Sequence, residues 1–246
     1  MKKYILTLLA GIALLTQSCD DNDGYSIGDL AADWVTVHKH SPQLYTYTGD
    51  TWGTLWPAAG GFTNLILQEG QRAILYFNPL WDNFDGYDAA IKPEYIQPFL
   101  TKQVEELTEE NEEEYANHPT YIEDAWISAD YLHIQFTQKL PQEKKHRVSL
   151  VHKVDEPIMD DQGYIQLEYR YNSYGDTLQM AQPALVCYNL QTLPLTEAKG
   201  IQLRVNDARK GKRVITFNKE GESTSVSSKG RNLSTMKGYD ATENIK

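Results

Sequence analysis

The sequence predicts a mainly β protein in which an N-terminal OB-like barrel is followed by a C-terminal β-sandwich. Apolar residues make up 41% of the 246 residues, which is enough for buried cores. The 16 tyrosines and 5 tryptophans favour strands. Short runs of alternating apolar and polar residues, separated by turn residues, recur from residue 34 to residue 218. A chain of this length is commonly divided between two compact units.

Residues 1–18 are expected to be a signal peptide. Lys2 and Lys3 give the segment a positive start, and an apolar stretch follows at residues 4–15. This stretch is shorter than the roughly 20 residues that a helix needs to cross a bilayer. The segment is therefore expected to direct export and then to be removed.

Cys19, in the segment LTQSC, is the expected lipidation site. In lipoprotein processing this cysteine becomes the acylated N-terminus, and ordinary secretory cleavage near Ser18 is the alternative. The segment departs from the usual lipobox because Thr16 holds the position where Leu is usual. With Cys19 acylated, Cys187 has no disulfide partner and is expected to be a small buried residue, since no familiar cysteine–histidine pattern surrounds it.

Residues 19–32 are expected to form an acidic tether, because Asp20, Asp21 and Asp23 follow the cysteine directly. The run resembles the acidic export signal of lipoproteins in Bacteroidota. That resemblance implies a lipid-anchored protein of the outer membrane, exposed at the cell surface. The lipid bilayer is then a partner through Cys19.

Residues 33–104 are predicted to form the barrel. Apolar and polar residues alternate at 34–39, and further strands are expected at 44–48, 72–80 and 87–91. Several short strands with little helix are typical of a small closed barrel of the OB type. Only residues 93–107 are expected to include a helix.

The run EELTEENEEE is predicted to lie in an acidic linker at residues 105–118. Cation binding is the alternative, but the spacing of a calcium loop is absent. Residues 119–220 are predicted to form the β-sandwich, with strands at residues 131–136, 146–151, 163–171, 200–205 and 213–218. Residues 221–246 are rich in Ser, Gly, Lys and Asn and are expected to form a disordered tail.

The sequence contains no familiar catalytic, metal-binding or cofactor motif, so we expect no catalytic residue, no metal site and no cofactor. His38 and His40 share a strand face, and an exposed polar face is a simpler explanation for them than a metal site. The same explanation is expected to hold for His133. The net charge of −11, from 34 acidic and 23 basic residues, opposes binding of nucleic acid.

The residues that most suggest binding are aromatic. Tyr45 and Tyr47 share a strand face, and Trp52 and Trp56 follow just beyond it. OB barrels bind oligosaccharides and oligonucleotides on such faces by ring stacking. The alternative is that these rings fill a small barrel. A ligand, if one binds, is expected to be a glycan, a peptide or a protein, since the flanks lack clustered Lys and Arg.

The order of these segments resembles the NigD-like family of lipoproteins in Bacteroidota. The matching stretches are YSIGDLAADWVTV at 25–37, GTLWPAA at 53–59, GQRAILYFNPL at 70–80, EDAWISADYLHIQF at 123–136, HRVSLV at 146–151 and LEYRYNSYGD at 167–176. The resemblance implies an N-terminal OB-like domain and a C-terminal β-sandwich domain. It also implies an association with bacteriocin immunity, and it carries no catalytic residue.

The sequence therefore leads to a surface-anchored, non-enzymatic binding or accessory lipoprotein, with a bacteriocin-immunity role as its more specific form. The competing hypothesis is an envelope hydrolase whose active site has no familiar motif.

Overall fold

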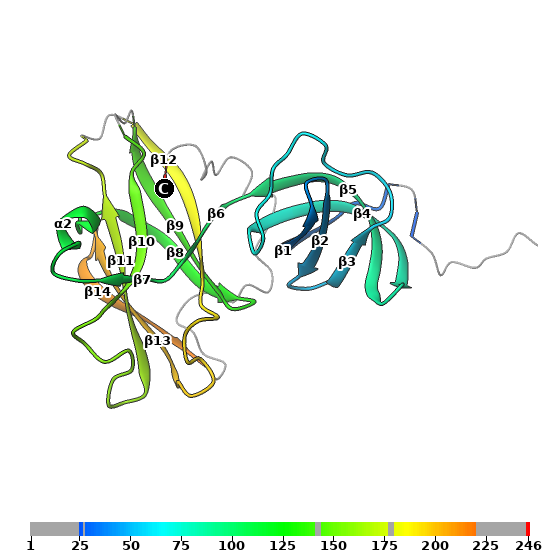
Figure 1. Cartoon of the computed structure of the whole chain (residues 1–246). Helices are drawn as coiled ribbons and strands as arrows, with labels where there is room; N and C mark the ends of the chain where they lie inside the picture. The colour runs from blue at the N-terminus through cyan, green and yellow to red at the C-terminus, as the bar shows by residue number, and fades with distance from the viewer. Residues whose placement is uncertain (1–24, 27, 141–143, 177–179, 220–244) are drawn as a thin grey trace, which may run out of the picture.

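The computed structural model describes residues 25–26, 28–140, 144–176, 180–219 and 245–246. The expected signal peptide, Cys19 and the first part of the expected tether lie outside these residues, as does most of the expected tail. The described chain forms a barrel and a sandwich that lie side by side (Figure 1). None of the helices in these ranges is long and apolar enough to span a membrane.

Five strands close the N-terminal barrel: β1 (Ala31–Ser41), β2 (Leu44–Gly49), β3 (Gly53–Pro57), β4 (Arg72–Phe84) and β5 (Tyr87–Pro98). Their order around the barrel is β1-β2-β3-β5-β4. The pairing of β3 with β5 is parallel, and the other four pairings are antiparallel. This closed arrangement confirms the predicted OB-like barrel.

The barrel interior follows from the period-two pattern of its strands. Val35 and Val37 of β1 point inward, and so do Leu75 and Phe77 of β4 and Ile91 of β5. Because neighbouring residues of a strand point to opposite faces, the residues between them lie on the outside.

The C-terminal domain is a sandwich of two sheets, as predicted. One sheet has the order β14-β13-β11-β10-β7, and the other has the order β6-β12-β9-β8. The strands of these two sheets are β6 (Leu100–Gln103), β7 (Glu105–Leu107), β8 (Tyr121–Ser128), β9 (Tyr131–Leu140), β10 (Arg147–Lys153), β11 (Tyr164–Asn172), β12 (Met180–Asn189), β13 (Gly200–Asp207) and β14 (Gly211–Asn218). A single turn of helix, α2 (Glu112–Tyr115), follows β7.

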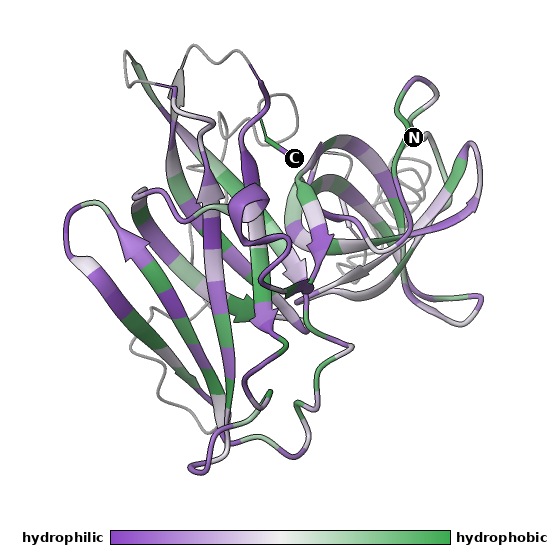
Figure 2. Ribbon diagram, turned by 60° about the vertical axis from the view of Figure 1, so that its left-hand side comes forward, coloured by the Kyte–Doolittle hydropathy of each residue, from purple (hydrophilic) through white to green (hydrophobic). Residues whose placement is uncertain are grey.

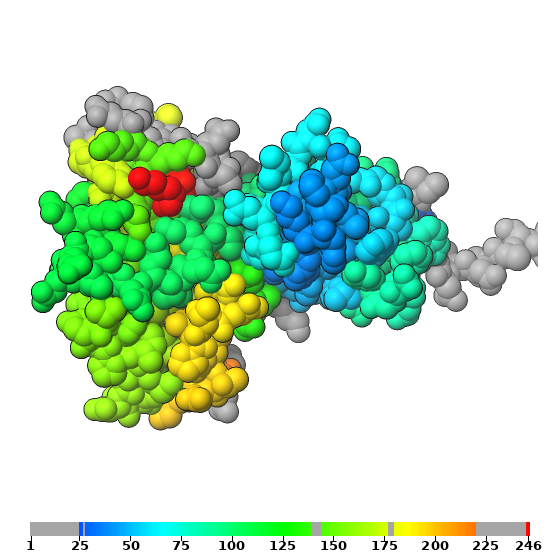
Figure 3. All heavy atoms as spheres, in the orientation of Figure 1, coloured from blue at the N-terminus to red at the C-terminus, as the bar shows by residue number. Residues whose placement is uncertain are grey.

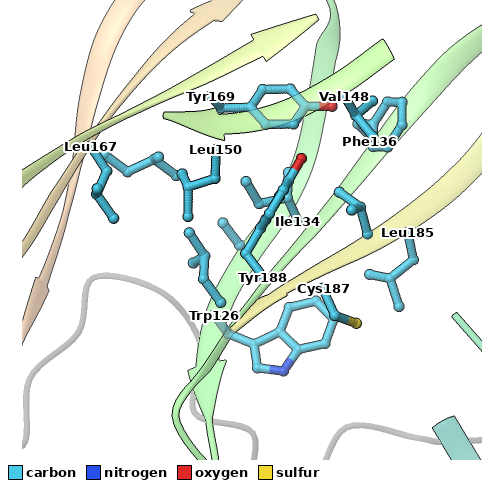
Figure 4. Packing of buried hydrophobic residues seen from close by; sticks show 14 of the residues in the cluster. Trp126, Ile134, Phe136, Val148, Leu150, Leu167, Tyr169, Leu185, Cys187 and Tyr188 are labelled. Carbon is cyan, nitrogen blue, oxygen red and sulfur yellow. The ribbon is translucent and has the colours of Figure 1, made fainter. Parts of the chain in front are cut away.

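The sandwich core lies between the two sheets. Figure 4 shows Phe136 and Leu185 from one sheet beside Leu150 and Tyr169 from the other, all of them buried. In Figure 2 the strands of this domain alternate between hydrophobic and hydrophilic residues. The alternation is what places one face of each sheet in the core.

The two domains share buried contacts, and no spacer separates them. The barrel ends at Pro98, Phe99 is fully buried, and β6 of the sandwich begins at Leu100. Trp34 and Ile74, on the outside of the barrel, belong to the same buried cluster as the sandwich core. Figure 3 shows the two bodies packed against each other along this boundary.

Arg72 of β4 is a polar bridge within this shared region, and its side chain is fully buried. The guanidinium donates to both carboxylate oxygens of Asp50, at 2.8 and 2.7 Å, and to the Thr36 hydroxyl at 3.0 Å. It also reaches the Ser128 hydroxyl of the sandwich at 3.4 Å and lies over the Tyr131 ring.

The helix expected at residues 93–107 is absent, and strands take its place. Residues 93–98 continue β5 opposite β4, and β6 and β7 pair in parallel with β12 and β10. Pairing with strands distant in sequence decides the structure here, because a local pattern interrupted by prolines supplies little helix propensity.

The linker expected at residues 105–118 is also wrong, because this segment belongs to the sandwich. Glu105–Leu107 is a strand of the five-stranded sheet. Arg147 pairs with both Glu105 and Glu114, and Tyr115 is buried. Arginines distant in sequence balance the acidic run, which therefore packs against the domain.

The last two residues correct the expected tail in part. Ile245 is buried in the sandwich core. Lys246 forms backbone hydrogen bonds with β10 and with His146, which directly precedes β10. The Lys246 N–H donates to the His146 carbonyl, and the Val148 N–H donates to the Lys246 carbonyl, both at 3.0 Å. These residues appear as red spheres on the sandwich in Figure 3.

Candidate functional site

Tyr45 and Tyr47 lie inside the barrel and do not form an exposed ligand face. Their exposed fractions are 3% and 2%, and both belong to the barrel core. The Tyr45 hydroxyl donates to the Pro42 carbonyl at 3.1 Å and accepts from the Leu67 N–H at 3.3 Å. Burial raises the pKa of Tyr47 well above its ordinary value. The face that these residues share is the inward face, so the barrel-filling alternative holds for them.

The two tryptophans of the predicted face, Trp52 and Trp56, are half-buried and contact different rings. Trp52 packs edge-on against Phe77 at 5.3 Å between ring centroids. The buried Asp33 carboxylate accepts a hydrogen bond from the backbone N–H of Trp52 at 2.9 Å. This bond fixes the turn that carries the ring. Trp56 instead contacts Tyr87 of β5 at 5.2 Å.

Trp56 leads to an aromatic surface around the hairpin that joins β4 and β5. Trp81 and Phe84 of β4 stack at 6.0 Å, and Phe84 is the cross-strand partner of Tyr87. Tyr87 contacts Trp56, so the four rings form two contacting pairs that are joined by the backbone pairing of Phe84 with Tyr87. Trp81 is 57% exposed. We call these four rings, together with the carboxylates of Asp82, Asp85 and Asp88, the hairpin surface.

The sequence folds into this hairpin because Asp85 and Gly86 form its two-residue turn. Their φ values are 48° and 86°. Positive φ at both turn positions is the geometry that matches the twist of two antiparallel strands, and Asp-Gly is a preferred pair for it. The hairpin projects from the end of the barrel that is remote from the sandwich (Figure 1).

Two of the three carboxylates are held in place by hydrogen bonds. Asp82 accepts from the Tyr25 hydroxyl at 2.8 Å, and this bond raises the pKa of Tyr25. Asp88 accepts from both the N–H and the hydroxyl of Thr54 at 2.7 Å, and these bonds lower the pKa of Asp88. Asp85 is exposed at the turn. The rings are therefore flanked by three negative charges.

No positive charge balances them nearby in sequence. Between residues 41 and 91 the only Lys or Arg is Arg72, which is buried and paired with Asp50. Lys92, the next basic residue, pairs with Glu94 at 2.7 Å. The hairpin surface is both aromatic and acidic.

The sequence prediction missed Trp81, Phe84 and Tyr87. The signal is present in WDNFDGYD, where aromatic residues and aspartates interleave around an Asp-Gly pair. Two extended runs that flank Asp-Gly indicate a hairpin, and large apolar side chains near its turn are exposed more often than those in mid-strand.

A second arrangement of chemically capable groups lies at the boundary between the domains. The Cys187 sulfur is 3.3 Å from His133 Nδ1, and His133 Nε2 is 3.0 Å from the Ser128 hydroxyl. The His133 ring stacks on Trp126 at 4.8 Å, and the Trp34 ring lies 4.9 Å away. The exposed position expected for His133 is wrong, because the barrel covers the polar face of β9 at this point.

This arrangement is not suited to nucleophilic chemistry. Cys187 is fully buried, as expected, and its burial raises the pKa of the thiol to about 12. A thiol that holds its proton and has no access to solvent is a poor nucleophile. The cysteine and histidine therefore act as packing residues between the domains.

The two histidines of β1 in the barrel contact threonines of β2. His38 Nε2 lies 2.9 Å from the Thr48 hydroxyl, and His40 Nε2 lies 2.8 Å from the Thr46 hydroxyl. Over the described ranges, no group of three or more His, Cys, Asp or Glu side chains is placed to hold a metal ion.

Known structures share this two-domain arrangement. A protein of unknown function from Bacteroides vulgatus is 23% identical with a TM-score of 0.72, covering 86% of this chain and 100% of that chain. A protein from Parabacteroides distasonis, described as toxin related, is 26% identical with a TM-score of 0.63, covering 78% and 95%. A NigD-like immunity protein from Bacteroides caccae is 13% identical with a TM-score of 0.54, covering 79% and 100%.

Family models agree with the predicted resemblance, whereas no curated protein matches the chain. The NigD-like N-terminal OB domain matches residues 34–98, and the NigD-like C-terminal beta sandwich domain matches residues 103–219. These bounds follow the barrel and the sandwich, in the same order and over most of the chain. The chain belongs to the NigD-like family.

Proposed function

We propose that this chain is a lipid-anchored envelope protein that binds a partner through the hairpin surface and catalyses no reaction. The observation that carries the proposal is the group of one exposed ring, Trp81, and three half-buried rings at the remote end of the barrel. Large apolar side chains that gather on a surface commonly mark an interaction site. The partner is a protein, a peptide or a glycan, because three carboxylates without a nearby cation repel nucleic acid.

The anchor is proposed at Cys19, in the outer membrane with the protein exposed at the cell surface. An apolar stretch too short to span a bilayer, followed by a cysteine and three aspartates, supports this location. A structure similar to this chain, from Bacteroides fragilis, is described as a lipoprotein. In a Cys19→Ala variant we expect an unprocessed precursor or release from the membrane fraction, and normal processing with unchanged membrane association would contradict the anchor.

Immunity against a bacteriocin is the more specific form of this proposal. The similar structure from Parabacteroides distasonis is described as toxin related, and it is 26% identical to this chain. An anchored protein that binds a toxin at the cell surface would protect the cell without catalysis. Cells that lack the protein should then become more sensitive to a bacteriocin from a related strain.

A hydrolase remains the competing function, and its strongest candidate residues are Cys187 and His133. Their burial between the domains argues against it. Substitution Cys187→Ser should leave any hydrolytic activity of the envelope fraction unchanged.

Cross-linking on intact cells tests the binding surface. The lipidated chain should capture a cell-surface component that a Trp81→Ala, Phe84→Ala variant does not capture. Tyr95→Ala is the matched control, because Tyr95 is an exposed ring of the same strand pair outside the hairpin surface. Equal capture by all three proteins would show that the hairpin surface is not the binding site.

A further inference from the structure

We infer that the hairpin surface binds a cationic segment of a polypeptide, with an arginine or lysine side chain seated on its rings beside its carboxylates. This inference rests on the proposed function and names the chemistry of the partner. It is carried by two features of the described residues: how the chain fills similar places elsewhere, and the charge around the hairpin.

Elsewhere in this molecule, two arginines lie over an aromatic ring and pair with a nearby carboxylate. Two such sets lie on the sandwich: Arg147 over Tyr115 with Glu114, and Arg209 over Tyr121 with Glu123. The guanidinium carbons lie 4.1 and 5.0 Å from the ring centroids, and the ion pairs measure 2.7 and 2.8 Å. A cation over a ring and beside a carboxylate gains from both the ring quadrupole and the charge.

The hairpin surface has the same two ingredients without the cation. In the chain Asp82 follows Trp81, Asp85 follows Phe84 and Asp88 follows Tyr87. No Lys or Arg of the described segments lies over these rings or pairs with these carboxylates. A cation supplied by another molecule would complete the set.

The wider charge distribution favours the same partner. Residues 41–71 and 73–91 of the barrel contain no Lys or Arg. The whole chain carries a net charge of −11. A basic peptide would therefore be attracted over a distance and then held by the rings. A neutral glycan would use the rings but would leave the three carboxylates without a counter-charge.

Peptides of alternating glycine and arginine are the probe, and peptides with citrulline in place of arginine are the neutral control. We expect the full mature chain to bind the arginine peptide, more weakly as salt rises. Trp81→Ala should weaken this binding about tenfold, which corresponds to roughly 1.4 kcal/mol, within the range of cation–π contacts.

Charge variants of equal net charge separate the hairpin from the general acidity of the chain. Asp82→Asn with Asp85→Asn should also weaken binding about tenfold, since each removed carboxylate was an ion-pair partner. Asn tolerates the positive φ of Asp85, so the turn is kept. Asp155→Asn with Asp161→Asn, at exposed sites on the sandwich, is the matched control and should have little effect.

The outcomes distinguish this inference from the proposed function. Equal binding of the citrulline peptide would overturn the cationic partner, and so would arginine-peptide binding that survives Trp81→Ala. A neutral hexasaccharide that binds the mature chain but not the Trp81→Ala variant, without salt dependence, would also overturn it while leaving the hairpin as a binding surface. Failure of the peptides, the sugar and the capture on cells together would remove the proposed function as well.

Discussion

Cys187 shows how burial by itself removes the chemistry that a residue type offers. A cysteine within 3.3 Å of a histidine has the composition of a nucleophile and its base. Desolvation nevertheless favours the neutral thiol and raises its pKa from 9.0 to about 12. Composition and distance therefore do not identify an active site without access to solvent.

This burial predicts the reactivity of the thiol. In a Cys19→Ala background, where Cys187 is the only cysteine, a thiol reagent should react slowly with the folded chain and fully after denaturation. The shift also links folding to pH. Because the unfolded thiol loses its proton first, Cys187 should make the chain less stable as pH rises from about 9 towards 12. Rapid labelling of the folded chain near neutral pH would contradict the buried position.

The candidate site was the part least predictable from sequence. The alternation at Tyr45 and Tyr47 shows correctly that they share a face. It cannot tell the inside of a barrel from the outside, because aromatic rings suit both. Trp81 was missed for the opposite reason, since the alternation weakens towards the turn. Its exposure depends on how far β4 and β5 extend beyond the closed barrel, which is a property of strand pairing.

At the scale of single elements, β10 is completed along one edge by two separate segments. β7 pairs in parallel with Val151–Lys153, and Ile245 forms a parallel bridge at His146. An unpaired edge is open to another chain, so the terminal residues close this stretch of it. Ile245 also fills a place in the core, where it is 2% exposed.

Substitution Ile245→Ala tests this closure. Removal of a buried isoleucine side chain commonly costs about 2–5 kcal/mol, and we expect a loss of that size in the free energy of unfolding. Val214→Ala is the control, because Val214 is an exposed residue of β14 and should change stability by no more than about 0.5 kcal/mol. Urea denaturation measures both. A loss for Ile245→Ala no larger than the control's would show that residue 245 does not close the core.

Elements with strong alternation were predicted well, whereas those fixed by distant partners were not. The strands at β1, β4, β9 and β11 follow from period two. The segment from residue 99 to residue 118 was expected to be helix and then linker. Its strands are made by pairing with β10 and β12, and its acidic residues are neutralised by Arg147 and Arg170. The local sequence shows neither the partner strands nor the partner arginines.

At the scale of the whole molecule, the two domains share one buried core. Trp34, Ile74 and Phe99 join the sandwich core, and Arg72 bridges the boundary. Domains that share a buried core in this way are expected to unfold together. The family resemblance predicted both domains and their order, but the shared core depends on contacts between them that no sequence motif marks.

We therefore expect one unfolding transition, seen at the same urea concentration by tryptophan fluorescence and by far-ultraviolet circular dichroism. Arg72→Ala should lower the free energy of unfolding by about 1.5–3 kcal/mol, because the hydrogen bonds of the buried guanidinium to Asp50 are lost. Arg209→Ala, at an exposed ion pair with Glu123, should cost no more than about 1 kcal/mol. Two separate transitions in the unmodified chain would show that the domains are independent.

The hydrogen bond from Tyr25 to Asp82 ties the start of the described chain to the hairpin. If Cys19 is the anchored residue, five residues lie between it and Tyr25, and the chain from Cys19 to Tyr25 extends roughly 20 Å at most. With such an anchor the hairpin would lie close to the lipid headgroups and the sandwich farther from the membrane. A partner would be met in the thin layer just above the membrane, where a molecule about to enter the bilayer has to pass.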